Sequence, residues 1–236
     1  MIEKILKKIY YEKYTKKSYS ISSVDLIIDR MFSNIKKGTF IDIGCNHPIK
    51  FNNTYLLYKR GWRGINIDLD KKSIEEFNKI RENDYNVQTL ISSDNDIERK
   101  IYFYHSRSAI NTVSEDLVNY RKTNKKKIKI IKQSSETIEK IIENSPFKNK
   151  KIDLMSIDIE NHEYEALYKF NFDKYKIDII VTEIHDLTQN KLEIYNQNLD
   201  FVINSNLYKL MLKNNYKLIN WVNSDFIFAR IGIELK

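Results

Sequence analysis

Hydrophobic residues in the first half of the chain follow two patterns, one typical of buried strands and one typical of amphipathic helices. Short apolar runs bounded by polar residues predict strands at 39–43, 64–68 and 87–92. Apolar residues at helical spacing predict helices before and between these strands, at 1–14, 24–32, 53–60 and 73–81. Because strands and helices alternate at the spacing of βαβ units, the strands should pair in parallel.

The second half of the chain continues this alternation and ends in a different unit. It contains predicted buried strands at 152–158 and 177–183, and predicted helices at 135–142 and from residue 164. Three segments lie between the halves: a predicted strand at 100–104, a polar loop at 106–112 and a lysine-bearing surface segment at 119–132. The last two apolar runs, 216–222 and 226–231, flank Asn223-Ser224-Asp225. This turn chemistry predicts a terminal antiparallel hairpin.

Together these elements predict an α/β fold with a doubly wound sheet. We expect seven strands, mostly parallel and Rossmann-like, with helices at the N-terminus and an antiparallel hairpin at the C-terminus. The chain divides into an N-terminal helical segment, 1–37, and a Rossmann-like domain, 38–236. The N-terminal segment should pack on the sheet or on a second subunit of a homodimer.

Composition narrows the classes of protein that fit this pattern. With 42% hydrophobic and 31% charged residues, the 236-residue chain has enough apolar surface to fold as a globular protein. Its formal net charge of +8 favours anionic partners. The single cysteine excludes an internal disulfide and a cysteine-rich zinc cluster, and predicts a reducing, cytoplasmic location. No run approaches the roughly 20 apolar residues that cross a bilayer.

The glycines indicate a bend that approaches a ligand. Four of the five glycines fall between Gly38 and Gly64, and Gly44 directly follows the first predicted strand. Asp68 ends the next strand. In open α/β sheets, a glycine turn after one strand and an acid after the next bind an adenosine ligand, with the carboxylate on the ribose hydroxyls.

Further details favour an adenosine ligand that has no pyrophosphate. The motifs Gly-x-Gly-x-x-Gly and Gly-Lys-Ser/Thr are absent, and Pro48 removes an N–H group that a pyrophosphate would need. S-adenosylmethionine meets this requirement. Its cationic sulfonium also suits a pocket that contains Asp42, Asp68 and Asp70.

Two groups of residues carry the motifs of a known family. The first comprises FIDIGCN, NTYLL and GWRG at 40–46, 53–57 and 61–64, and the second comprises DLMSIDIE and HE at 153–160 and 162–163. With these motifs the chain resembles the FkbM-type family of S-adenosylmethionine-dependent methyltransferases over residues 40–185. It departs from the family pattern at Cys45 for alanine, Asp68-Leu69 for Glu-Pro and Asn161 for glycine. Asp68 keeps the carboxylate, and asparagine tolerates the left-handed backbone.

The resemblance implies a set of cofactor contacts. They comprise Asp42, Gly44, Cys45 and Asn46 on the methionine side, Asn53 and Thr54 at the amino-acid end, Asp68 on the ribose, Ile91 and Ser92 beside adenine, and also Leu69 and Asp158. Local sequence offers a second explanation for Asn53 and Thr54, as the N-cap of the following helix.

Spacing predicts the acceptor side of the site. Asp158 and Glu160 are two residues apart, as are Glu183 and His185, so each pair points to one side of its strand. If these strands are neighbours, Asp158, Glu183 and His185 converge above the sheet. A hydroxyl acceptor needs either a base, for which His185 is the candidate, or a divalent cation such as Mg or Mn held by those three residues.

The reaction that we expect is methyl transfer to a hydroxyl oxygen. The resemblance implies a sugar acceptor, either nucleotide-linked or within a surface glycan or capsule precursor. Two alternatives stay open: a nucleic-acid methyltransferase, which the positive charge permits, and a cofactor-binding subunit without activity. Nucleic acid is the less favoured partner because no Asn-Pro-Pro-Tyr or Pro-Cys motif occurs and the lysines are dispersed.

Overall fold

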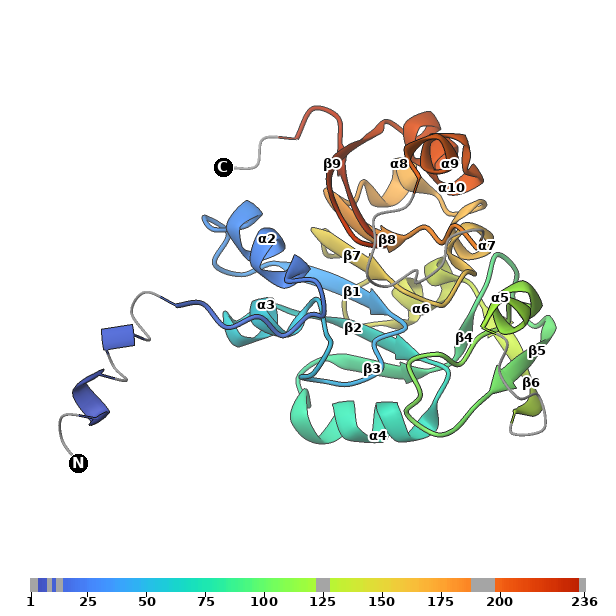
Figure 1. The fold of residues 1–236 in the computed structure, drawn as a ribbon, viewed down its shortest axis with the longest axis horizontal. Coiled ribbons are helices and arrows are strands. Elements are labelled where there is room, and N and C mark those ends of the chain that lie inside the picture. The colour runs from blue at the N-terminus through green and yellow to red at the C-terminus, as the bar shows by residue number, and fades with distance from the viewer. Residues whose placement is uncertain (1–3, 8–9, 12–14, 122–127, 188–197, 234–236) are drawn as a thin grey trace.

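The computed structural model of the protein describes residues 4–7, 10–11, 15–121, 128–187 and 198–233. Figure 1 shows its elements, which are α2 (Val24–Met31), β1 (Thr39–Ile43), α3 (Tyr55–Lys59), β2 (Arg63–Asp68), α4 (Lys71–Ile80), β3 (Tyr85–Gln88), β4 (Leu90–Ile91), β5 (Glu98–Phe103), α5 (Glu115–Tyr120), β6 (Lys129–Glu136), α6 (Ile138–Asn144), β7 (Leu154–Ile157), α7 (Glu163–Leu167), α8 (Phe172–Tyr175), β8 (Ile179–Glu183), α9 (Leu199–Asn204), α10 (Asn206–Lys213), β9 (Tyr216–Val222) and β10 (Asp225–Arg230).

Seven strands form one sheet, in the order β3-β2-β1-β7-β8-β10-β9. Neighbouring strands from β3 to β8 pair in parallel, whereas β10 runs antiparallel to both β8 and β9. This arrangement confirms the predicted fold class, a mostly parallel Rossmann-like sheet with a C-terminal antiparallel hairpin (Figure 1). The strand order changes direction between β1 and β7, and folds of this kind bind ligands in the crevice at that point.

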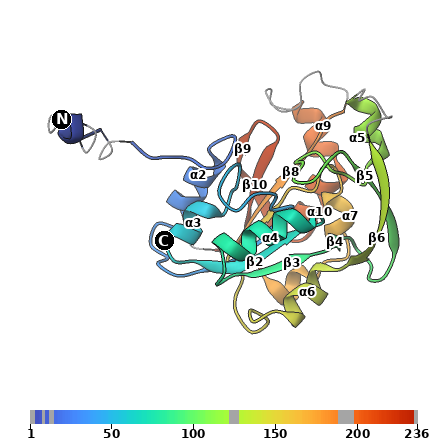
Figure 2. The same ribbon diagram turned by 90° about the horizontal axis from the view of Figure 1, so that it is seen from below.

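Helices cover both faces of the sheet. Helices α6 to α10 pack on one face, in a core that includes Ile41 and Ile43 of β1. Helices α2 and α3 pack on the other face, in a core that includes Phe40 of the same strand. Neighbouring residues of β1 thus enter different cores, because side chains alternate along a strand. Figure 2 shows α2, α3 and α4 together, with α6 on the opposite side of the sheet.

The segment before β1 contributes to this structure through α2. Val24 and Ile28 of this helix are fully buried against the sheet. Residues 4–7 and 10–11 are helical and exposed, and Figure 1 shows them away from the sheet. The other residues of the helix predicted at 1–14 lie outside the described residues. Within the described part of the chain, no helix has the length and hydrophobicity needed to cross a membrane.

A second sheet of three strands, in the order β4-β6-β5, was not predicted. The run predicted as one strand at 87–92 breaks at Thr89, whose N–H donates to the Asp68 carbonyl at 3.0 Å, and β4 then pairs with β6. The strand β6 occupies residues expected to form a surface segment and the start of a helix. Helix α6 therefore begins at Ile138, where the Thr137 side chain caps it, and not at Ser135.

Close packing between β1 and β2 depends on Gly64. A Cβ atom at this position would lie 2.1 Å from the Phe40 carbonyl oxygen, which belongs to the paired strand. Real Cβ atoms do not approach backbone this closely, so a larger residue would force the two strands apart.

We expect Gly64→Ala to lower the free energy of unfolding by about 3 kcal/mol, because overpacking a rigid core displaces backbone. Gly61→Ala is the matched control, since a Cβ at Gly61 meets nothing within 4 Å. The control should cost about 1–2 kcal/mol, from the left-handed backbone alone. Denaturant unfolding would measure both values. Equal losses in the two variants would contradict the packing argument.

Candidate functional site

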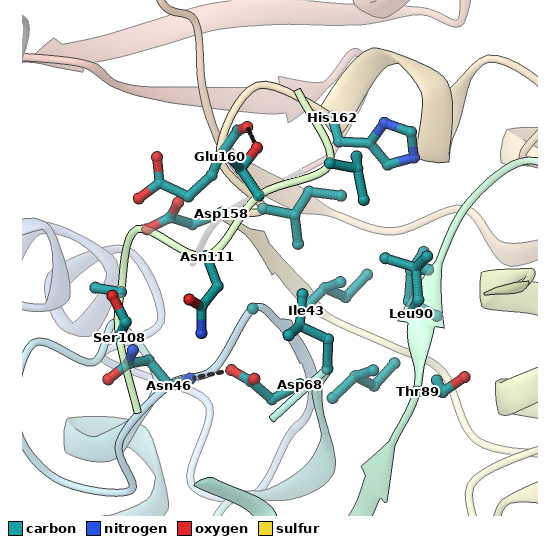
Figure 3. A pocket seen from close by; sticks show the side chains of 18 of the residues that line it. Ile43, Asn46, Asp68, Thr89, Leu90, Ser108, Asn111, Asp158, Glu160 and His162 are labelled. Carbon is teal, nitrogen blue, oxygen red and sulfur yellow. Dashed lines mark hydrogen bonds between the residues drawn. The ribbon is translucent and has the colours of Figure 1, made fainter. Parts of the chain in front are cut away.

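A cleft opens at the carboxyl ends of β1, β2 and β7. Its apolar side includes Ile43 and Leu90, and its polar side includes Asn46, Ser108, Asn111, Asp158 and Glu160 (Figure 3). The apolar residues Ile67, Leu69 and Ile91 also line the cleft. The arrangement suits a ligand with a flat apolar group at one end and charged or polar groups at the other.

The chain bends sharply over the end of β1 at Gly44. The backbone N–H groups of Gly44 and Cys45 both donate to the Ile67 carbonyl, at 2.8 and 3.1 Å. Gly44 has a φ of +77°, and a Cβ atom there would lie 1.7 Å from the Asp158 carbonyl oxygen. Only glycine fits this position, because it combines a left-handed backbone with direct contact to another chain segment.

Asp68 lies at the end of β2, beside this bend. Its Oδ2 accepts a hydrogen bond from the Asn46 N–H at 2.8 Å, and its Oδ1 accepts one from the Asp70 N–H at 2.7 Å. A carboxylate oxygen can accept two hydrogen bonds, so both atoms can still accept one from a ligand hydroxyl. Desolvation raises the pKa of Asp68 to about 6, against the effect of its backbone hydrogen bonds.

A loop between β5 and α5 closes one side of the cleft. The carboxylate of Asp70, which is the N-cap of α4, accepts hydrogen bonds from the Ser106 hydroxyl at 3.1 Å and from the Arg107 N–H. At the far end of the loop, the Thr112 hydroxyl donates to the Glu160 carbonyl at 2.7 Å. Hydrogen bonds therefore hold this loop both to the segment after β2 and to the segment after β7.

Two of the residues expected to contact the cofactor, Asp42 and Thr54, lie beneath the cleft in a buried network. Asp42 Oδ2 accepts hydrogen bonds from the Thr54 hydroxyl at 2.7 Å and from Asn52 Nδ2 at 3.0 Å. The buried Arg81 guanidinium donates to Thr54, to Asn52 and to the Pro48 carbonyl, at 2.8, 2.6 and 2.9 Å. Burial raises the pKa of Asp42, and the Arg81 charge opposes that rise. These residues support the bend from below.

Three more of the expected cofactor residues lie behind the lining of the cleft. Cys45 packs against α4, and burial raises the pKa of its thiol well above the ordinary value. Asn53 Nδ2 donates to the Ser156 hydroxyl at 3.2 Å, and the Ser92 hydroxyl is 3.3 Å from His162 Nε2. The expected residues that do line the cleft are Gly44, Asn46, Asp68, Leu69, Ile91, Asp158 and Glu160.

The structure brings Asp158, Glu183 and His185 together at the ends of β7 and β8. His185 Nε2 is 2.8 Å from Glu183 Oε2, while Ser224 donates to the other oxygen of Glu183 at 2.9 Å. Burial alone would raise the pKa of Glu183, but His185 and the hydrogen bonds from Ser224 and Asp158 lower it. Burial would lower the pKa of His185, but Glu183 and two further carboxylates raise it to about 9. His185 is therefore a cation at neutral pH.

Of these three residues, only Asp158 lines the cleft. Asp158 is exposed, because the cleft that it lines opens to solvent. Desolvation by the surrounding protein, together with the nearby carboxylates of Glu183 and Glu160, raises the pKa of Asp158 well above the ordinary value. Asp158 is thus a carboxylate of raised pKa that a ligand in the cleft can reach.

The backbone after Asp158 is unusual, because Glu160 and Asn161 both have a left-handed φ, of 59° and 68°. The Glu160 carboxylate accepts a hydrogen bond from Arg121 Nη2 at 2.7 Å, yet burial raises the pKa of Glu160 to about 7. Glu163 Oε1 accepts from the Ile159 N–H at 2.8 Å, and burial raises its pKa to about 7 as well. Both carboxylates hold the turn between β7 and α7.

Among the described residues, no three His, Cys, Asp or Glu side chains are arranged to hold a metal ion. The expected set was Asp158, Glu183 and His185. Here His185 Nε2 lies 2.8 Å from Glu183 Oε2, so these two side chains pair with each other.

Sequence reasoning missed several residues that form the site. Ile21, Phe51 and Thr89 line the cleft, as do His162 and five residues of the segment 108–113, all except Ile110. The only signal for 108–113 was the polar composition of its loop. For Ile21 and Phe51 no local signal exists, because both come from segments that reach the cleft only in the folded structure.

The sheet order, the glycine bend after β1 and the acid after β2 define the class of Rossmann-like methyltransferase folds. Within that class, the family model for the methyltransferase FkbM domain matches residues 42–218. The chain therefore belongs to the FkbM methyltransferase family, as its motifs indicated. No curated protein matches the chain.

Stability should depend on pH through Glu163. Its pKa of about 7 lies above the ordinary 4.5, so its contribution is complete below pH 4.5 and is lost as pH rises through about 7. At 1.36 kcal/mol per pKa unit, the loss reaches about 3 kcal/mol. We expect Glu163→Gln to reduce the fall in melting temperature between pH 5 and pH 8. The matched control is Glu165→Gln, an exposed position on the same helix, and a control that behaves like Glu163→Gln would refute the assignment.

Proposed function

We propose that the protein transfers a methyl group from S-adenosylmethionine to a hydroxyl oxygen. The observation that carries this proposal is the position of Asp68, beside the Gly44 bend and at the edge of a cleft with one apolar side. Asp68 would accept hydrogen bonds from the ribose hydroxyls, while Leu69 and Ile91 would enclose the adenine ring. When bound, the cofactor supplies an activated methyl group on a cationic sulfonium.

The polar side of the cleft supports a cationic ligand with a hydroxyl-bearing neighbour. Asp158 and Glu160 line this side and stand close to further carboxylates, which stabilise a positive charge. Asn46, Ser108 and Asn111 add neutral groups that can hydrogen-bond hydroxyls. Together with the family membership, this chemistry favours a sugar acceptor, either nucleotide-linked or part of a surface glycan.

Asp158 is the residue that would remove the proton from the acceptor hydroxyl. As the oxygen forms its bond to the methyl carbon, the hydroxyl proton must move to a base. A carboxylate with a raised pKa is a stronger base than an ordinary one once it is ionised, and the positive charge of the bound cofactor would favour the ionised form of Asp158, which lines the cleft. We assign this role to Asp158 and not to His185, the other candidate, because Asp158 lines the cleft whereas His185 is bonded to Glu183 behind it. His185 would instead keep Glu183 ionised behind Asp158.

A nucleic-acid acceptor is compatible with the positive net charge of the chain but not with the carboxylates that line the cleft. A phosphodiester near the reacting position would face Asp158 and Glu160, and like charges repel strongly in a partly desolvated site. Binding of a random duplex with a steep negative salt dependence would favour that alternative over a sugar.

Binding of the demethylated cofactor, S-adenosylhomocysteine, tests the role of Asp68. We expect Asp68→Asn to weaken binding at least about tenfold, because charge-assisted hydrogen bonds to the ribose are lost. Asp173→Asn, at an exposed position on α8, is the control and should leave the affinity unchanged. Isothermal titration calorimetry measures both. The proposal fails if the wild-type protein binds neither form of the cofactor.

Turnover measurements should distinguish the role of Asp158 from that of His185. The acceptor for this assay is first found in a panel of nucleotide sugars, as the one whose mass increases by one methylene group. With that acceptor, Asp158→Asn should lower turnover about a hundredfold or more. The affinity of the Asp158→Asn variant for S-adenosylhomocysteine should stay within a few-fold of the wild-type affinity. His185→Gln should cost less and shift the pH profile, because it removes the positive charge beside Glu183. The reverse order of effects would return the role of base to His185.

A further inference from the structure

Phe51 combines three features that stability alone does not favour. Its side chain is 57% exposed, its backbone has a left-handed φ of 54°, and it lines the cleft. A left-handed φ is strained for a bulky residue, and such strain clusters at ligand-binding sites. An exposed aromatic ring gains nothing from burial in the free protein. These features point to a role for the ring in contacting a ligand.

Ile21 brings a second exposed apolar side chain to the same cleft. Its side chain is 72% exposed, and it belongs to a turn held by the buried carboxylate of Asp25. Asp25 accepts hydrogen bonds from the Ser18 hydroxyl and the Tyr19 N–H, both at 2.6 Å. The Tyr19 carbonyl then accepts from the Asn52 N–H at 3.0 Å. This bond places the segment that carries Ile21 beside the segment that carries Phe51.

The surroundings of Phe51 favour one kind of occupant. The Lys50 ammonium group lies 4.5 Å from the centre of the ring, and Asn46 and Asp158 line the same cleft. An aliphatic chain would fit the apolar side chains but leave Asp158 without a hydrogen-bond donor. A pyranose ring fits both requirements, because it has an apolar C–H face and a rim of hydroxyl groups.

We propose that Phe51 and Ile21 form an acceptor subsite, in which the apolar face of a pyranose ring packs on Phe51 while its hydroxyls face Asp158. This inference rests on the proposed function and names the part of the cleft that would select the acceptor. The cofactor would occupy the part between Asp68 and Ile91 and would not depend on Phe51.

Saturation-transfer NMR tests the subsite without requiring turnover. The probes are methyl glucopyranoside, galactopyranoside and mannopyranoside, together with their UDP-linked sugars. We expect saturation of the ring C–H protons of at least one probe by the wild-type protein. Phe51→Ala should reduce that signal at least fivefold, whereas Phe51→Trp should retain it.

A matched control separates the subsite from any exposed aromatic ring. Tyr168 is 38% exposed and has the Lys169 ammonium 5.3 Å from its ring centre, but it is not among the residues that line the cleft. Tyr168→Ala should therefore leave the sugar signal unchanged. The melting temperature of Phe51→Ala should equal or exceed that of the wild type, because the ring is exposed in the free protein.

The other outcomes overturn the inference in recognisable ways. If Phe51→Ala weakens S-adenosylhomocysteine binding in parallel with the sugar signal, Phe51 belongs to the cofactor site. If no probe is saturated by the wild type, or if an oligonucleotide is saturated in place of the sugars, the subsite does not bind a pyranose. Failure of the proposed function itself would appear separately, as loss of S-adenosylhomocysteine binding to the wild-type protein.

Discussion

The cleft depends on one buried cation, Arg81, which holds the loop between β1 and α3. Its guanidinium donates to the Pro48 carbonyl and to the side chains of Asn52 and Thr54, and its charge offsets that of Asp42. Removing one partner of such a buried pair typically costs about 3–5 kcal/mol, because the other charge stays buried and unpaired. The loop that carries the cleft-lining residues therefore has a defined shape before any ligand binds.

Charge is distributed unevenly between the surface and the cleft. The chain carries a formal net charge of +8, yet carboxylates gather around Asp158 at the ends of β7 and β8. Desolvation and mutual repulsion raise the pKa of Asp158 and Glu160. A cation bound in the cleft would relieve this repulsion and favour the ionised forms. The net charge is thus a poor guide to the ligand, since the local field has the opposite sign.

The sequence predicted the parts of the fold whose signals are local. Strands β1 and β7 are apolar runs because both of their faces are buried, and Gly44 and Asp68 stand directly at strand ends. Strand β6 was missed because most of its residues are exposed, so no hydrophobic pattern marks it. Arg81 was missed for a related reason: it is one of 40 basic residues, and only the tertiary structure buries it.

The N-terminal segment illustrates how the cleft depends on contacts that are distant in sequence. Asn223, in the turn between β9 and β10, donates to the Ser22 hydroxyl at 3.3 Å, and Asn52 donates to Tyr19. Ile21 lies between these two bonded positions, so both the first loop and the last hairpin help to hold it in the cleft wall. Because the entropy of closing a loop grows only slowly with its length, a few such bonds are enough to hold this segment. One wall of the cleft is thus held by segments from both ends of the fold.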